Sequence, residues 1–139
     1  MRRIMHESLI NPNGNWIAAA NYLLGDKKAV AHAVVISVRG SAPRELGANM
    51  LISENQIWNT IGGGSLEFEV MEQARGLIKK IGLKVEGSNR KVLNLALGPD
   101  MGQCCGGNVK VLLEILSRSD INKLSKHSQK LVALEHPLK

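Results

Sequence analysis

The sequence predicts a mixed α/β domain of the α+β kind, in which one mixed β-sheet of about five strands is flanked by helices. Short β-branched, apolar runs alternate with segments whose apolar residues recur at helical spacing. The chain has 139 residues, 44% of them apolar, which is enough for one hydrophobic core. No internal repeat or low-complexity linker interrupts it. We therefore expect a single domain over residues 1–139, with its core at about 15–116.

The first half of the chain predicts one helix and three strands. Residues 15–24 are amphipathic and end at Gly25, as expected of a helix. The first strand is almost continuously apolar, which is typical of a central strand covered on both faces. The next two are short and joined through Glu54 and Asn55 as a hairpin. The predicted strands are Ala29–Val38, Ala48–Ser53 and Gln56–Ile61.

The second half predicts a long helix, two strands and a final helix. After Gly62–Ser65, apolar residues from Leu66 to Ile81 fall on one helical face. Glutamates in the first turn and lysines in the last turn match the helix dipole, and either Gly64 or Ser65 can cap the helix. The predicted strands are Arg90–Leu97 and Val109–Leu116, and the final helix covers about 119–135.

Composition excludes several classes of protein. The longest apolar run is far shorter than the ~20 residues of a membrane-spanning helix, and the N-terminus lacks the features of a secretory signal, so we expect a cytoplasmic protein without a membrane span. Adjacent Cys104 and Cys105 cannot form a disulfide framework and should be reduced thiols. The net charge of +6 comes from scattered residues, and aromatic residues make up only 3% of the chain. This composition argues against a nucleic-acid partner.

Three glycine-bearing loops each follow a predicted strand, over 39–47, 62–65 and 98–108. Loops that follow strands of one direction gather at one edge of a sheet, and glycine lets backbone N–H groups approach an anion closely. Each loop alone is equally well explained as a structural turn. We expect a binding site only if the three loops converge.

The turn Gly62–Ser65 opens onto a helix N-terminus, where unpaired N–H groups favour phosphate. Glu67 and Glu69 place negative charge in the same first turn, which would repel phosphate unless they point away or bind a donor. The alternative is that they only cap the helix. The spacing of the glycines matches neither a dinucleotide fingerprint nor a P-loop.

Arg44 and the two thiols are the side chains with the most distinctive chemistry. Arg44, in the loop with Ser41, can bind a phosphate in bidentate fashion, or it can be a solvated arginine or pair with Glu45. Cys104 and Cys105 stand between glycines in a loop, a position that indicates exposure and so thiolate chemistry or contact with a soft metal. The alternative is that they are only small, buried apolar residues.

Zinc binding is not expected, because no Cys-x-x-Cys spacing exists and the histidines have no ligand-like spacing. The histidines are interpreted as surface residues or as residues whose hydrogen bonds are satisfied. They are His6, His32, His127 and His136.

Taken together, the segments 39–50, 61–67 and 97–107 resemble the XdhC/CoxI family, accessory proteins of xanthine dehydrogenase and carbon monoxide dehydrogenase. The resemblance covers about residues 15–116 and includes the order and spacing of the three segments. It implies a chaperone, rather than an enzyme, that binds the molybdenum cofactor (molybdopterin) as cargo and supports its sulfuration and insertion into a molybdenum hydroxylase.

The resemblance also implies which residues face the cofactor. Backbone N–H groups and Arg44 would hold the pterin phosphate, and Cys104 or Cys105 would approach molybdenum, with the choice between them open. The candidate cofactor-binding residues are Ser41, Arg44, Gly62, Gly63, Gly64, Ser65, Glu67, Gln103, Cys104, Cys105, Gly106 and Gly107.

Longer members of the family continue into a second, Rossmann-like domain that is absent here, so we expect either a separate partner domain or a truncated copy. The other expected partners are an apo-dehydrogenase and a cysteine desulfurase. The surface left by the missing half would expose apolar residues of the last helix and favour a homo-oligomer. These residues are Leu124, Leu131, Val132 and Leu134. The alternative function is a thiol-based enzyme, a sulfur carrier or oxidoreductase, that uses Cys104 and Cys105.

Overall fold

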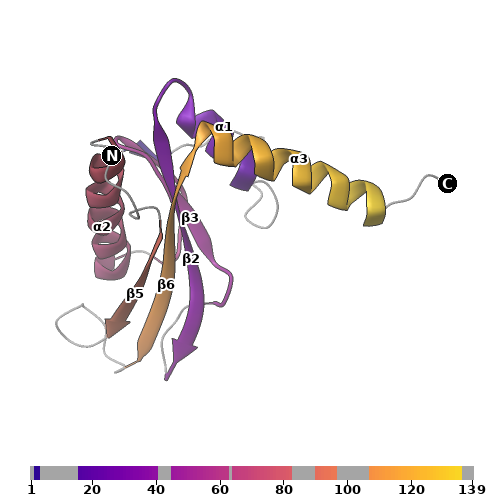
Figure 1. Ribbon diagram of the computed structural model, residues 1–139. Coiled ribbons are helices and arrows are strands. Elements are labelled where there is room, and N and C mark those ends of the chain that lie inside the picture. The colour runs from indigo at the N-terminus through magenta and orange to yellow at the C-terminus, as the bar shows by residue number, and fades with distance from the viewer. Residues whose placement is uncertain are drawn as a thin grey trace.

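The computed structural model describes residues 2–3, 16–40, 45–62, 64–82, 90–96 and 107–135. Within them the chain forms one sheet in the order β1-β4-β3-β2-β6-β5, with α2 on one face and α1 and α3 on the other (Figure 1). β1 pairs with β4 in parallel, and all other neighbours are antiparallel. The predicted mixed fold is confirmed. The strands are β1 (Arg2–Arg3), β2 (Ala29–Arg39), β3 (Asn49–Ile52), β4 (Gln56–Asn59), β5 (Arg90–Ala96) and β6 (Asn108–Ser117).

The main core lies between the sheet and α2 (Gly64–Gly82). Alternate residues of the central strands face this helix, because side chains of a strand point to opposite faces in turn. The helix contributes the face that its periodicity predicted. The residues of α2 in this core are Leu66, Val70, Ala74, Leu77 and Ile78.

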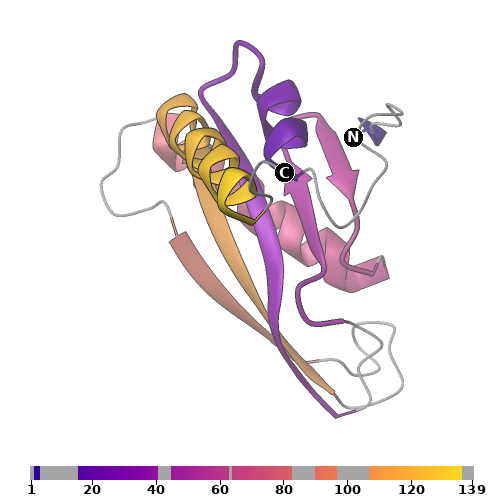
Figure 2. The same ribbon diagram turned by 90° about the vertical axis from the view of Figure 1, so that its right-hand side faces the viewer.

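A second, smaller core lies under α1 (Trp16–Leu24) and α3 (Arg118–Glu135) on the opposite face. Trp58, 2% exposed, is the largest fully buried side chain of the described residues and belongs to this core. Arg118 joins the two helices, since its Nη2 donates to the carbonyl of Gly25 (2.6 Å) and its Nη1 to Asn21 Oδ1. Figure 2 shows α1 and α3 side by side on this face.

α3 begins with a reciprocal cap. The backbone N–H and hydroxyl of Ser117 both donate to Asp120 Oδ2 (2.9 Å each), and the Asp120 N–H donates to Ser117 Oγ (3.3 Å). Such an exchange satisfies donors that a helix start leaves without intrahelical partners. The helix therefore starts close to the predicted position. Of the four apolar residues expected on the surface of the last helix, only Leu124 has a described side chain, because the side chains of residues 127–135 lie outside the described set. Leu124 is partly buried and packs against the second core.

β2 was expected to be covered on both faces, and only its first half is. Val30 is fully buried under α1 and α3, whereas Ile36, farther along, is 45% exposed. The helices of the second face cross only the end of the sheet where β2 begins (Figure 1). An irregularity in the pairing with β6 falls between Val35 and Ser37. The apolar composition of the strand thus overestimates its coverage.

Candidate functional site

The strands that precede the three glycine-bearing loops run in one direction. β3 is antiparallel to both β2 and β4, and β6 is antiparallel to both β2 and β5, so β2, β4 and β5 are parallel in direction. Their carboxyl ends therefore point to the same end of the sheet. This arrangement meets the directional condition under which the loops can form one site.

Two of the three loops leave from adjacent strands at the same level. Asn108, the first residue of β6, pairs with both Arg39, the last residue of β2, and Ala96, the last residue of β5. The loops that follow β2 and β5 therefore begin side by side. The following predicted site residues lie outside the described residues: Ser41, Arg44, Gly63, Gln103, Cys104, Cys105 and Gly106. Gly107 is described and is buried where the chain enters β6.

β4 ends well before the tip of β2. Asn59 pairs with Met50, which in turn pairs with Ala33, six residues before Arg39. At ~3.3 Å per residue this offset is roughly 20 Å. The chain that returns from the tip of β2 closes part of this distance, because the Gly47 N–H donates to the Val35 carbonyl (2.8 Å) and the Val35 N–H to the Ala48 carbonyl (2.9 Å).

A cavity of about 300 Å³ lies between this returning segment and the end of β4. Its walls come from the residues that follow the predicted Ser41–Arg44 loop and from those that precede the predicted Gly62–Ser65 turn. The lining residues are Glu45, Leu46, Gly47, Ala48, Asn49, Asn59 and Thr60. The cavity is at the lower end of the usual size of small-molecule sites. We take it, with the adjoining turns, as the candidate site.

The turn from β4 into α2 is held together by Thr60. Its hydroxyl donates to Glu67 Oε2 and accepts the Gly62 N–H (2.9 Å). The residue before it, Asn59, has a φ of 62°, a left-handed conformation that asparagine tolerates better than most residues. Glu67 is only 7% exposed. The Gly62 N–H and the Glu67 carboxylate thus already have partners within the turn.

These contacts refine the predicted phosphate cradle. Because Gly62 donates to Thr60, a phosphate contact in this turn would depend on N–H groups at the start of α2, which begins at Gly64 (φ 70°) and Ser65. From the sequence, a glutamate here is expected to repel phosphate unless it points away or binds a donor. Glu67 does bind a donor, the Thr60 hydroxyl. Glu69 pairs instead with Gln73, whose Nε2 donates to its Oε1 (3.3 Å).

His32 connects α1 to the wall of the candidate site. Its ring stacks on Trp16, with centroids 3.9 Å apart and an interplanar angle of 9°. Nε2 donates to Asn49 Oδ1 (3.1 Å), and Asn49 Nδ2 donates to the Gly47 carbonyl (3.4 Å). Burial lowers the pKa of His32 below its usual 6.5, although the hydrogen bond to Asn49 and the charge of Glu114 oppose this shift. The interpretation of His32 as a satisfied residue is confirmed.

Sequence reasoning missed four residues of this region: Trp16, Asn49, Asn59 and Thr60 as members of a site. One signal was available, because Asn59 and Thr60 are polar residues at the end of a strand and directly precede the glycine turn. The hydrogen bond between His32 and Asn49 had no local signal in the sequence, because it depends on the register of β2 and β3.

Among the described residues, no group of three or more His, Cys, Asp or Glu side chains could hold a metal ion. Cys104 and Cys105 are outside that part of the chain. No helix in the described ranges combines the length and apolar character needed to cross a bilayer.

Comparison with protein families gives a match at residues 23–85 to the model described as the XdhC and CoxI family. Over these residues the chain is similar to the XdhC and CoxI family, as its sequence motifs predicted. The matched segment extends from the end of α1 to just beyond α2 and contains the cavity lined by residues 45–49, 59 and 60. It ends before β5, so the Cys104 and Cys105 loop lies outside the match.

A solved structure has the same fold. It is the crystal structure of a protein described as a xanthine dehydrogenase from Bacillus halodurans, with 25% sequence identity and a TM-score of 0.66. The match covers 84% of this chain but 35% of that one, so this chain spans about a third of the length of its structural neighbour. No curated protein matches the sequence.

Proposed function

We propose that this chain is an accessory protein that binds the molybdenum cofactor as cargo and supports its sulfuration and insertion into a molybdenum hydroxylase such as xanthine dehydrogenase. The match of residues 23–85 to the XdhC and CoxI family is the observation that carries the proposal. The neighbour described as a xanthine dehydrogenase agrees with an apo-dehydrogenase as partner. A cysteine desulfurase is the proposed sulfur source.

The geometry of the sheet end supports a single cofactor site. The loops that contain Arg44 and the two cysteines begin beside each other at β2 and β5, and the cavity near Thr60 adjoins the returning segment of the first loop. In this proposal Arg44 and N–H groups at the start of α2 bind the pterin phosphate. Cys104 or Cys105 contacts molybdenum, for which thiolate is a suitable soft ligand.

The surroundings of Glu67 are compatible with an anion in the adjoining turn. Its carboxylate accepts a hydrogen bond from Thr60, and the side chain is buried rather than directed into solvent. The charge that appears unfavourable in the sequence is thus directed into the fold.

The test is the affinity of the purified protein for molybdopterin. Combined replacement of Arg44 by alanine and of Cys104 and Cys105 by serine is expected to weaken binding at least about tenfold, because a phosphate contact and the thiols are lost together; tenfold corresponds to ~1.4 kcal/mol. Lys123→Gln, an exposed site on α3, is the control and should bind like the wild type.

Failure of the wild type to bind, or equal affinity of the triple variant, would contradict the proposal. A persulfide on Cys104 or Cys105 in a protein that binds no pterin would instead favour the thiol-based enzyme.

A further inference from the structure

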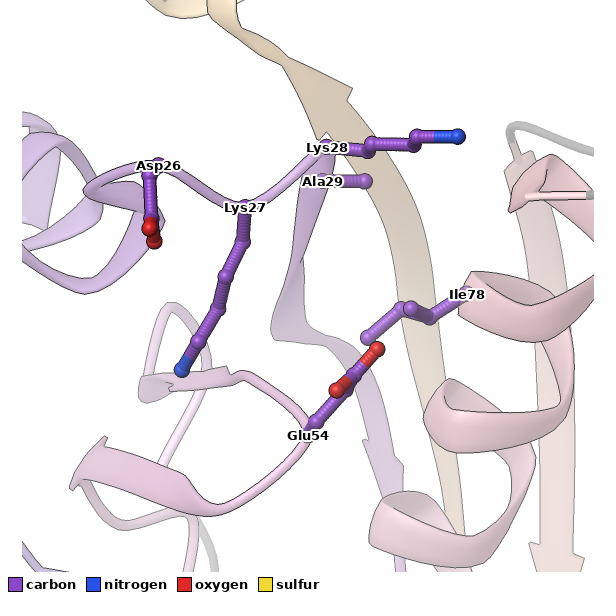
Figure 3. A pocket seen from close by; sticks show the side chains of 6 residues that line it. All are labelled: Asp26, Lys27, Lys28, Ala29, Glu54 and Ile78. Carbon is purple, nitrogen blue, oxygen red and sulfur yellow. The ribbon is translucent and has the colours of Figure 1, made fainter.

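A groove made of two adjoining cavities lies at the opposite end of the sheet from the candidate site. The cavities have volumes of about 400 and 350 Å³ and share Glu54 and Ile78. They lie between the start of β2, the β3–β4 turn and the last turns of α2. Figure 3 shows one of them, with Lys28 reaching across toward α2 and the Glu54 carboxylate directed toward Ile78.

The groove has an excess of positive charge. Its lining includes four cationic side chains and two carboxylates, a formal charge of +2. The cations are Lys27, Lys28, Arg75 and Lys79, and the carboxylates are Asp26 and Glu54. Among the described residues, no ion pair joins a cation of this set to either carboxylate. Arg75 has a partner outside the groove, Glu72, with Nη1 3.7 Å from Oε1.

Arg75 also has a donor without an acceptor. Its Nε is buried and makes no hydrogen bond to any described residue. A buried donor without a partner destabilises the fold, so such a group in a native protein calls for an explanation. Arg75 also lines the larger cavity, so a turn of its guanidinium toward the groove would bring Nε to a ligand with acceptor oxygens.

The β3–β4 turn that forms one wall is held in place. Lys27 Nζ donates to Asn55 Oδ1 (2.8 Å) and to Ser53 Oγ (3.4 Å), and the Gln56 N–H donates to Ser53 Oγ (3.1 Å). These contacts fix the turn that carries Glu54. The wall is therefore built before any ligand arrives, which reduces the entropic cost of binding.

We propose that this groove is a second binding site, distinct from the cofactor site, for a small ligand that carries a phosphate or diphosphate group. Arg75, Lys79 and Lys28 bind the phosphate oxygens. Glu54 accepts a hydrogen bond from a hydroxyl or N–H group elsewhere in the ligand, and Ile78 contacts its apolar part. An acidic protein segment would use the lysines, but it would bring its own carboxylates against Glu54 and Asp26.

Calorimetric titration of the full chain with inorganic pyrophosphate tests the site. We expect saturable binding that weakens as salt increases, and at least a tenfold loss of affinity in the double variant K28Q/K79Q, whose altered side chains are exposed and leave the cores intact. Arg75→Lys, which keeps the charge but removes Nε, should also weaken binding. Lys123→Gln is the matched control.

Absence of saturable pyrophosphate binding, or equal affinity in K28Q/K79Q, would overturn the proposal. So would displacement of pyrophosphate by polyglutamate at a lower concentration than by ADP, since that result would indicate an acidic protein partner. The readout does not involve molybdopterin, and the variants leave residues 41–44 and 103–107 unchanged. Failure here therefore does not bear on the proposed function.

Discussion

Replacement of Thr60 by valine is expected to lower the free energy of unfolding by about 1–3 kcal/mol and to weaken molybdopterin binding. The substitution removes the hydroxyl that donates to Glu67 and accepts the Gly62 N–H, while keeping the β-branched shape. Hydrogen bonds that involve a charged group contribute about 1.5–3 kcal/mol, and a buried carboxylate that loses a donor is costly. Urea unfolding followed by circular dichroism measures the change.

Thr60→Ser is the matched control, because it keeps the hydroxyl and removes only a methyl group. We expect the serine variant to recover most of the stability and the affinity. If valine and serine behave alike, the hydroxyl does not hold the turn, and this account of the turn from β4 into α2 is wrong.

Stability is expected to fall as the pH decreases below about 6.5, in part because of His32. Its pKa is lower in the folded protein than the usual 6.5, so the unfolded chain binds more protons in this range. Stability from this residue is therefore fully present above pH 6.5 and is lost as the pH falls toward the lower, folded pKa. Each unit of difference between the two pKa values is worth about 1.4 kcal/mol.

His32→Gln isolates this contribution, since glutamine does not titrate. Urea unfolding at pH 7.5 and 5.0 measures the free energy of unfolding of both proteins. Between the two pH values, the wild type should lose more of this free energy than the variant. Lys123→Gln, at an exposed site on α3, is the control and should leave the pH dependence unchanged. A constant difference between wild type and His32→Gln would show that burial does not favour the neutral form of His32.

Most of the fold could be predicted from the sequence because local pattern and tertiary packing agree. β2 and α2 fall within a residue or two of the expected positions. An apolar β-branched run is typical of a buried strand, and an apolar period of 3.6 residues is typical of an amphipathic helix. β1 had no such signal. It is a two-residue strand, Arg2–Arg3, that exists only because β4 offers an edge for pairing.

The candidate site was predictable in its glycines but not in its contacts. Gly62 and Gly64 have positive φ values, as turns require of glycine, and the sequence marks them directly. The contact of His32 with Asn49 depends on the register that pairs His32 with Leu51 and Val34 with Asn49. The burial of the second face of β2 depends on how far α1 and α3 extend over the sheet. The residue composition of the strand does not encode that extent.

The central claim is that the cofactor binds at the end of the sheet where β2, β4 and β5 terminate. Hydrogen–deuterium exchange measured by mass spectrometry, with and without molybdopterin, tests it most directly. The account predicts slower exchange within residues 40–49, 59–67 and 97–108, with residues 26–29 and 75–82 unchanged. Protection confined to residues 26–29 and 75–82, or no protection anywhere, would contradict it.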